Sequence, residues 1–167
     1  MGIRTAAVVA AAALALASVI DPSTGAFAFR DDPQCPRWTR AFLDMPMRAV
    51  GIRTAAGSRI LVPARLAATD EARGAGFQCA SPDEIRKTVI LFDFGQEVLG
   101  EFHMRNVPAP LEIAFATASG RIVAILRMDP SPTATYRPPA PYRYAIEARG
   151  GFFSERRIAP GDTVRPQ

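Results

Sequence analysis

The sequence is poor in the side chains that most enzymes use for acid–base chemistry and metal binding. Its 167 residues include one histidine, two cysteines and one tryptophan. The single histidine, His103, excludes metal sites built from two or more imidazole ligands. No Gly-x-Ser-x-Gly sequence occurs, which excludes the nucleophile turn of the α/β hydrolases. We therefore expect neither a bound metal nor a cofactor.

Long apolar runs are equally scarce, because the sequence has only one, over residues 6–20. It is short for a membrane span, which needs roughly 20 residues. Arg4 precedes the run, turn-forming residues 21–25 follow it, and Ala26 and Ala28 occupy the positions that a signal peptidase reads. The pattern predicts a cleavable signal peptide over residues 1–28, and hence a periplasmic or secreted protein without a membrane span after cleavage.

Both cysteines, Cys35 and Cys79, follow the predicted cleavage site. In an oxidising compartment an even pair of cysteines is most simply a disulfide. The bond would tie the N-terminal segment to the body of the domain. It would close a loop of about 45 residues, which stabilises a fold by roughly 3–4 kcal/mol.

The formal net charge is +4, but the basic residues are dispersed along the chain. Arg156 and Arg157 are the only adjacent arginines, and Lys87 is the only lysine. Nucleic-acid-binding domains gather positive charge on one face or stripe. The dispersal, together with the predicted export, leads us to expect no nucleic-acid partner.

From residue 58 onward, short stretches with strand-like alternation are separated by turn formers. Leu111, Ile113 and Phe115 alternate with smaller or polar residues, and the turn at 119–120 leads into the apolar residues 122–126. This pattern predicts a β-hairpin. Further strands are expected at residues 60–62, 88–92, 101–105, 142–148 and 163–165.

Helix signals are brief. Residues 69–73 fit a single turn, and Ser81 and Glu84 form a capping-box pattern that opens a second short helix. We predict a mainly β fold, a single compact antiparallel β-barrel or sandwich with one or two short helices, over residues 58–167. Residues 29–57, which are irregular and contain several prolines, are expected to form an arm that lies on this domain.

A series of short motifs occurs in order at residues 67–76, 90–94, 102–106, 110–113, 120–123, 144–147 and 160–162. Together, these motifs over residues 60 to 165 resemble the domain-of-unknown-function 192 (DUF192) family of bacterial and archaeal proteins, many of them exported. The sequence departs from the usual pattern at His103, where a tryptophan is common, at Glu112, where an aspartate is common, and at residues 74–77, where a Gly-Leu-Met segment is common. The resemblance implies a compact, mainly β domain and no established activity.

The polar residues of these motifs are the candidates to line a ligand pocket. An arginine and an asparagine suit an anionic or carbonyl-bearing ligand. The same side chains could instead satisfy turn carbonyls or pair across the hairpin. The sequence favours a non-catalytic binding or interaction domain of the cell envelope, whose partner is a small ligand or an envelope protein. The candidate residues are Arg73, His103, Arg105, Asn106 and Glu112.

Two alternative functions stay open at this point. A small periplasmic hydrolase could use His103 as a base beside Glu112. A copper-handling protein could use thioether ligands, although methionine is more often a packing residue. The candidate copper ligands are Met45, Met47, Met104, Met128 and His103.

Overall fold

The computed structural model describes residues 32–167, so the predicted signal peptide lies outside the described residues. This part of the chain is mainly β, as predicted, with four short helices and nine strands. The helices are α1 (Cys35–Asp44), α2 (Asp70–Ala75), α3 (Pro82–Lys87) and α4 (Phe152–Glu155). The strands are β1 (Met47–Arg53), β2 (Arg59–Ala67), β3 (Ile90–Val98), β4 (Phe102–His103), β5 (Leu111–Ala116), β6 (Ile122–Met128), β7 (Thr135–Tyr136), β8 (Tyr142–Arg149) and β9 (Thr163–Pro166).

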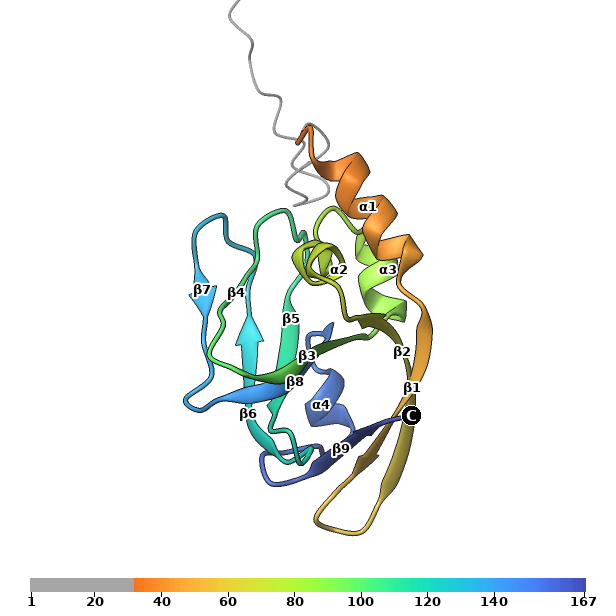
Figure 1. Cartoon of the computed structure of the whole chain (residues 1–167), viewed down its shortest axis with the longest axis vertical. Helices are drawn as coiled ribbons and strands as arrows, with labels where there is room; N and C mark the ends of the chain where they lie inside the picture. Colours follow the sequence, from red (N-terminus) through yellow and green to blue (C-terminus); the bar gives the residue numbers. More distant parts are fainter. Residues whose placement is uncertain (1–31) are drawn as a thin grey trace, which may run out of the picture.

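Seven strands form one sheet in the order β6-β5-β8-β3-β2-β1-β9, and β4 and β7 form a separate small sheet. Neighbours in the large sheet are antiparallel except β2 and β3, which are parallel, with Leu66 opposite Leu91. A parallel pair needs a crossover connection, and α2 and α3 supply it (Figure 1). The prediction of a wholly antiparallel sheet was wrong, because side-chain alternation does not reveal the direction of a neighbouring strand.

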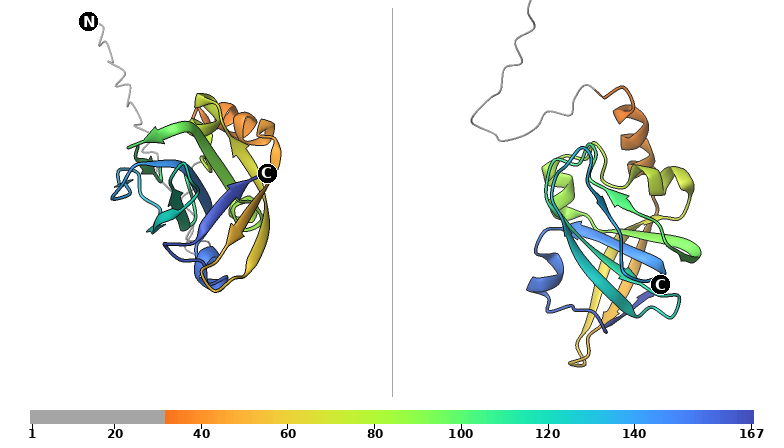
Figure 2. Two further views of the ribbon diagram at one scale, coloured as in Figure 1. Left: turned by 60° about the horizontal axis from the view of Figure 1, so that its bottom comes forward. Right: turned by 90° about the vertical axis from the view of Figure 1, so that its left-hand side faces the viewer.

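The large sheet curls, so that its two edge strands approach each other at one end (Figure 2). Arg121, just before β6, bridges to Thr163 of β9, and the Val164 N–H donates to the Gly120 carbonyl at 2.8 Å. Beyond Ile122, no hydrogen bond joins β6 to β9 within residues 32–167. The sheet is therefore curled but open, and neither a closed barrel nor a two-sheet sandwich forms.

Both predicted short helices are present, and the capping box at Ser81 is confirmed, whereas α2 begins one residue later than predicted, with Thr69 as its cap. The Thr69 hydroxyl accepts a hydrogen bond from the Ala72 N–H at the start of α2. At α3, the Ser81 hydroxyl accepts from the Glu84 N–H while the Glu84 carboxylate accepts from the Ser81 N–H. Such reciprocal capping satisfies donors that the first helical turn leaves without partners.

From residue 32 onward the N-terminal arm is not irregular, which corrects the expectation for the described part of residues 29–57. Within it, α1 begins with Pro36 in its first turn and β1 follows directly after Pro46. β1 pairs with β2 on one side and with β9 on the other. The sheet therefore begins before residue 58. The prolines lie at helix and strand boundaries, where a missing N–H costs little.

Both faces of the central strands of the sheet are covered by apolar side chains. On one face, Phe92 of β3 and Ile113 of β5 pack with Phe42 of α1 in what we term the first apolar cluster. On the other, Leu91 and Ala114 pack with the phenylalanines of α4 in the second apolar cluster. Because neither face of the central strands meets solvent, a polar side chain there needs a partner or a cavity inside the protein.

The predicted disulfide is confirmed. Cys35, at the start of α1, is bonded to Cys79, in the segment between α2 and α3, and their Cα atoms are 5.5 Å apart. The Cys79 N–H also donates to the carbonyl of Asn106 at 2.8 Å. The bond therefore fastens α1 over the first apolar cluster.

We expect the double variant Cys35→Ser/Cys79→Ser to unfold with a free energy lower by about 4 kcal/mol, because a loop-closing crosslink restricts the unfolded chain. Urea denaturation of the oxidised proteins measures this difference. Adding a reductant should lower the stability of the parent protein to that of the variant and leave the variant unchanged. Equal stability of the two oxidised proteins would contradict the expectation.

Candidate functional site

A cavity of about 270 Å³ lies among α2 and the residues that follow it, β3, β4 and β8. Its walls are aromatic, formed by Phe92, Phe94, Phe102 and Tyr142. These rings meet edge to face, with centroids 5.1 Å apart for Phe92 and Phe102 and 5.4 Å apart for Phe94 and Tyr142. Interlocked rings of this kind give a rigid, largely apolar pocket.

Of the five candidate residues, Arg73 and His103 line this cavity. The Arg73 guanidinium is already fully engaged in the structure. It donates to the carbonyls of Ala68 at 2.6 Å and Asp93 at 2.9 Å, and to the Asp70 carboxylate at 2.6 Å. It also lies 5.2 Å from the centre of the Phe94 ring. Arg73 therefore fastens α2 to β3 and offers little free positive charge to a ligand.

His103 lies in β4, half-buried beside the cavity. Burial, and then the positive charge of Arg105, lower the pKa of its imidazole below the usual value. The Arg105 N–H donates to His103 Nδ1 at 3.3 Å, so the neutral ring carries its proton on Nε2. At neutral pH His103 is therefore an uncharged hydrogen-bonding group.

The other three candidates do not line the cavity. Asn106 has a positive φ of 58°, a conformation that asparagine tolerates better than most residues. Its side-chain amide donates to the Asp32 carboxylate at 2.6 Å. Glu112 accepts from the Phe153 N–H at 3.0 Å, which places its carboxylate beside α4. Arg105 is exposed. The contact of Asn106 holds its own turn against Asp32, and the contact of Glu112 holds the start of α4.

The residue that stands out in the cavity is Glu147, which was not among the candidates. Its side chain is only 4% exposed, and in register it lies between Ile90 of β3 and Ile113 of β5. No hydrogen-bond or ion-pair partner for its carboxyl occurs among residues 32–167. Burial raises the pKa of Glu147 to about 8, so the carboxyl is largely protonated at neutral pH.

A second polar group in the cavity also lacks a partner. The Tyr142 hydroxyl is buried beside the Gly100 backbone, but no hydrogen bond of normal geometry joins the two, and the hydroxyl has no other partner in the described part of the chain. Burial raises its pKa to about 12, against a smaller opposing effect of the Gly100 backbone beside it. Buried polar groups are nearly always hydrogen-bonded, so two such groups in one cavity call for an explanation.

The backbone leaves room for these groups. Gly76, at the end of α2, has a φ of 47°, and a Cβ there would lie 3.5 Å from a Glu147 carboxylate oxygen and 3.6 Å from the Phe92 ring. Because residues other than glycine rarely adopt this conformation, the turn is best built with glycine. It allows the chain after α2 to pass close to the buried carboxyl.

Glu147 could have been found from one sequence signal, the Tyr-x-x-Glu motif at residues 144–147. Two residues before Glu147, Ala145 on the same side of β8 belongs to the first apolar cluster. The alternation of apolar and polar residues along the strand would predict that Glu147 faces solvent. Glu147 is instead buried, because apolar side chains cover both faces of β8.

A comparison with protein families matches residues 52–166 to DUF192, described as an uncharacterized ACR. This chain belongs to the DUF192 family. Solved structures share the fold of this DUF192 domain. One is a Sinorhizobium meliloti protein described as a candidate transcription regulator, with 24% identity, a TM-score of 0.66, and coverage of 73% of this chain and 95% of that chain. Another is a Novosphingobium aromaticivorans protein of unknown function, with 23% identity, a TM-score of 0.65, and coverage of 71% and 84%.

At these identities the likeness shows the fold of the DUF192 domain and no activity. No curated protein matches the chain. Within residues 32–167 no helix is long and apolar enough to cross a membrane.

The structure does not assemble the alternative sites. Met45, Met104 and Met128 are packing residues of the first apolar cluster, whereas Met47 is 55% exposed, so Met45 and Met47 do not share one site. No group of three or more histidine, cysteine or acidic side chains gathers for a metal among the described residues of the DUF192 domain. The two residues suggested for a hydrolase, His103 and Glu112, are also separated. The Glu112 carboxylate is bound at α4, whereas His103 lies beside the cavity.

The buried carboxyl predicts a pH dependence of stability. Glu147 ionises near 4.5 in the unfolded chain and near 8 in the folded protein, so the unfolded chain binds fewer protons between these values. The stability that the folded protein gains from the protonated Glu147 carboxyl is fully present below pH 4.5 and is lost as the pH rises towards 8. We expect Glu147→Gln to flatten the fall in unfolding free energy over this window.

Urea denaturation at a series of pH values measures this slope. Glu112→Gln is the matched control, because Glu112 lies on the neighbouring strand with its carboxylate away from the cavity. It should retain the slope of the parent protein. A Glu147→Gln variant whose stability falls with pH as steeply as that of the parent would show that the carboxyl is not the titrating group.

Proposed function

We propose that this DUF192 domain is a non-catalytic binding domain of the cell envelope, which holds a small carbonyl-bearing ligand in the cavity beside Glu147. The observation that carries the proposal is the buried carboxyl of Glu147, which has no partner within residues 32–167. A ligand that accepts its proton in a hydrogen bond would satisfy it.

The protonation state of the cavity favours a neutral acceptor. At neutral pH Glu147 is largely protonated, so its carboxyl donates one hydrogen bond. A carbonyl oxygen of the ligand can accept it. The aromatic walls would enclose the apolar part of the ligand.

An anionic ligand, the other class that the sequence suggested, finds less support. Arg73 is paired with Asp70, and His103 is neutral. The other acidic side chain at the cavity, Glu101, is already paired with Arg137. No cation that lines the cavity in the described structure is therefore without a partner, and an anion would meet the Glu147 carboxyl.

Export of the domain is part of the proposal, and the disulfide supports it. A bond between Cys35 and Cys79 persists in oxidising compartments and is rare in the cytosol. Together with the signal peptide predicted over residues 1–28, it favours a periplasmic or secreted protein. An extracytoplasmic binding domain needs no catalytic set, in keeping with the single histidine.

We expect cyclohexanone, used as a probe, to bind in the cavity at neutral pH and to dissociate as the pH rises above about 8, because only the protonated carboxyl donates to a carbonyl. His103 is already neutral in this window and the Tyr142 hydroxyl titrates above it. NMR titration of the amide signals around the cavity measures the affinity. Glu147→Gln keeps a donor and should bind without the pH dependence.

Two probes of the same shape make the test discriminating. Cyclohexylammonium should bind more weakly than the ketone at neutral pH, and cyclohexanecarboxylate should not bind. If the ammonium binds more tightly and its affinity rises through pH 8, the site is a cation site and the carbonyl assignment is wrong. If no probe shifts the signals of the cavity, the binding proposal loses its support.

Recovery of the protein from the envelope fraction of its host, without reductant, tests export. We expect native mass spectrometry to give a mass that lacks residues 1–28 and is lower by two hydrogens, for cleavage after Ala28 and the disulfide. A small molecule retained at the cavity would add its own mass. A full-length or fully reduced chain in the cytosolic fraction would contradict the assignment.

A further inference from the structure

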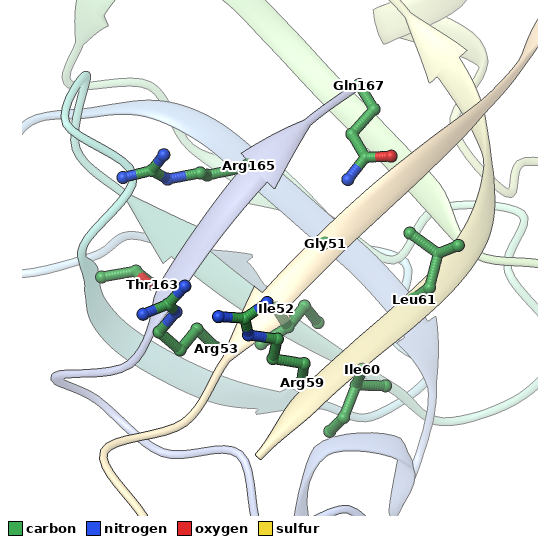
Figure 3. A pocket seen from close by; sticks show the side chains of 9 residues that line it. All are labelled: Gly51, Ile52, Arg53, Arg59, Ile60, Leu61, Thr163, Arg165 and Gln167. Atoms are coloured by element: carbon green, nitrogen blue, oxygen red, sulfur yellow. The ribbon is translucent and has the colours of Figure 1, made fainter. Parts of the chain in front are cut away.

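A second, separate hollow lies on the outer side of β2, β1 and β9. It encloses about 540 Å³ and shares no lining residue with the cavity beside Glu147 (Figure 3). Along these strands Val50, Ile52 and Val164 are buried in the second apolar cluster. Because successive side chains of a strand point to opposite faces, the residues next to these, including Arg53 and Arg165, face outward. We term this hollow the arginine groove.

Two arginines of the groove lie side by side on neighbouring strands. Arg53 of β1 is directly opposite Arg59 of β2 in the antiparallel register. Figure 3 shows both side chains extending in the same direction, with Thr163 of β9 next to Arg53. Like charges directly opposite each other destabilise a sheet. This pair therefore costs stability unless a negative charge lies between the two guanidinium groups.

No such charge comes from the described residues of the protein. Neither Arg53 nor Arg59 has a hydrogen bond or an ion pair with any side chain in the described range 32–167, and the same holds for Arg165. Some arginines elsewhere are paired, such as Arg143 with Asp93 and Arg149 with Glu155. Others, such as Arg105 and Arg121, also have no ion pair among the described residues. What distinguishes the groove is that two such arginines, Arg53 and Arg59, lie directly opposite each other on neighbouring strands.

The rest of the groove combines apolar and polar side chains. Gly51 lies opposite Leu61 on one side and Arg165 on the other, and the Gln167 side-chain amide lies close to it, 3.3 Å from where a Cβ would be. Leu61 is 64% exposed beside it. A cationic end next to an exposed apolar wall matches a molecule with an anionic head and an apolar body.

We propose that the arginine groove binds a phosphate group between Arg53 and Arg59. Guanidinium groups present paired N–H donors in a planar fork that matches phosphate oxygens bidentately. A bound phosphate would offset the repulsion between the two arginines. The group could be carried by a soluble phosphate ester or by the headgroup of an anionic phospholipid, in which case Leu61 would contact the apolar part.

The test compares the parent protein with Arg53→Gln/Arg59→Gln. We expect inorganic phosphate to bind the parent, as followed by calorimetry and by shifts of the Arg53, Arg59 and Thr163 amide signals. The double variant should bind at least about tenfold more weakly, since each charge-assisted hydrogen bond contributes on the order of a tenfold change in affinity. Arg86→Gln is the matched control, because Arg86 is an exposed arginine that is already paired with Asp83.

A stability measurement gives a second, independent readout. Phosphate should raise the unfolding midpoint of the parent and of Arg86→Gln, and leave that of the double variant unchanged. Without phosphate, the double variant should be at least as stable as the parent, because the like-charge pair is gone. If the variant fails to fold, the amide shifts of the parent decide alone, and shifts outside the groove overturn the proposal.

Vesicles distinguish the two sources of the phosphate. Cosedimentation with vesicles that contain phosphatidylglycerol, and not with neutral phosphatidylcholine vesicles, assigns the lipid headgroup if the double variant stays in the supernatant. Binding of inorganic phosphate without cosedimentation assigns a soluble phosphate. Equal binding of phosphate and vesicles by parent, control and double variant would mean non-specific attraction and would overturn the site.

Discussion

β8 lies between β3 and β5, and apolar side chains cover it on both faces, so a polar group on this strand can be satisfied only from inside the protein. The carboxyl of Glu147 is placed under this constraint. Burial keeps it protonated at neutral pH, and the glycine turn after α2 leaves space in front of it. The aromatic cavity and the proposed ligand chemistry both follow from that one position.

The rest of the fold holds this cavity in shape. α1 is fastened by the disulfide between Cys35 and Cys79, and the Arg73 guanidinium ties α2 to the backbone of β3. On the opposite face, Glu112 accepts from the first turn of α4. Polar residues that look like ligand-binding groups in the sequence thus serve as internal fasteners. The Glu147 carboxyl, which has no partner within residues 32–167, is the group in this cavity that is available to a ligand.

The two hollows of the molecule have opposite electrostatics. In the cavity beside Glu147 the ionisable groups are neutral or already paired, and the open positions are hydrogen-bond donors. In the arginine groove the cations are unpaired within the described structure, and the opening is wide and shallow. The two sites therefore select different chemistry, one a neutral acceptor and the other a phosphate. They lie on different parts of the sheet, so both can be occupied in one molecule.

Elements with local signals could be predicted from the amino-acid sequence. The capping box at Ser81, the hairpin of β5 and β6, and the pairing of the only two cysteines depend on neighbouring residues or on simple counting, and all are confirmed. The parallel pairing of β2 with β3 and the pairing of β1 with β9 could not be predicted, since a strand's sequence does not identify a distant partner or its direction. The packing of the whole fold sets these pairings. It also decided which polar side chains meet. Arg73 and His103 line one cavity, whereas the side chains of Asn106 and Glu112 bind Asp32 and the α4 backbone. Glu147 could not be identified from its own strand, because burial on both faces of a sheet is a property of the packed fold.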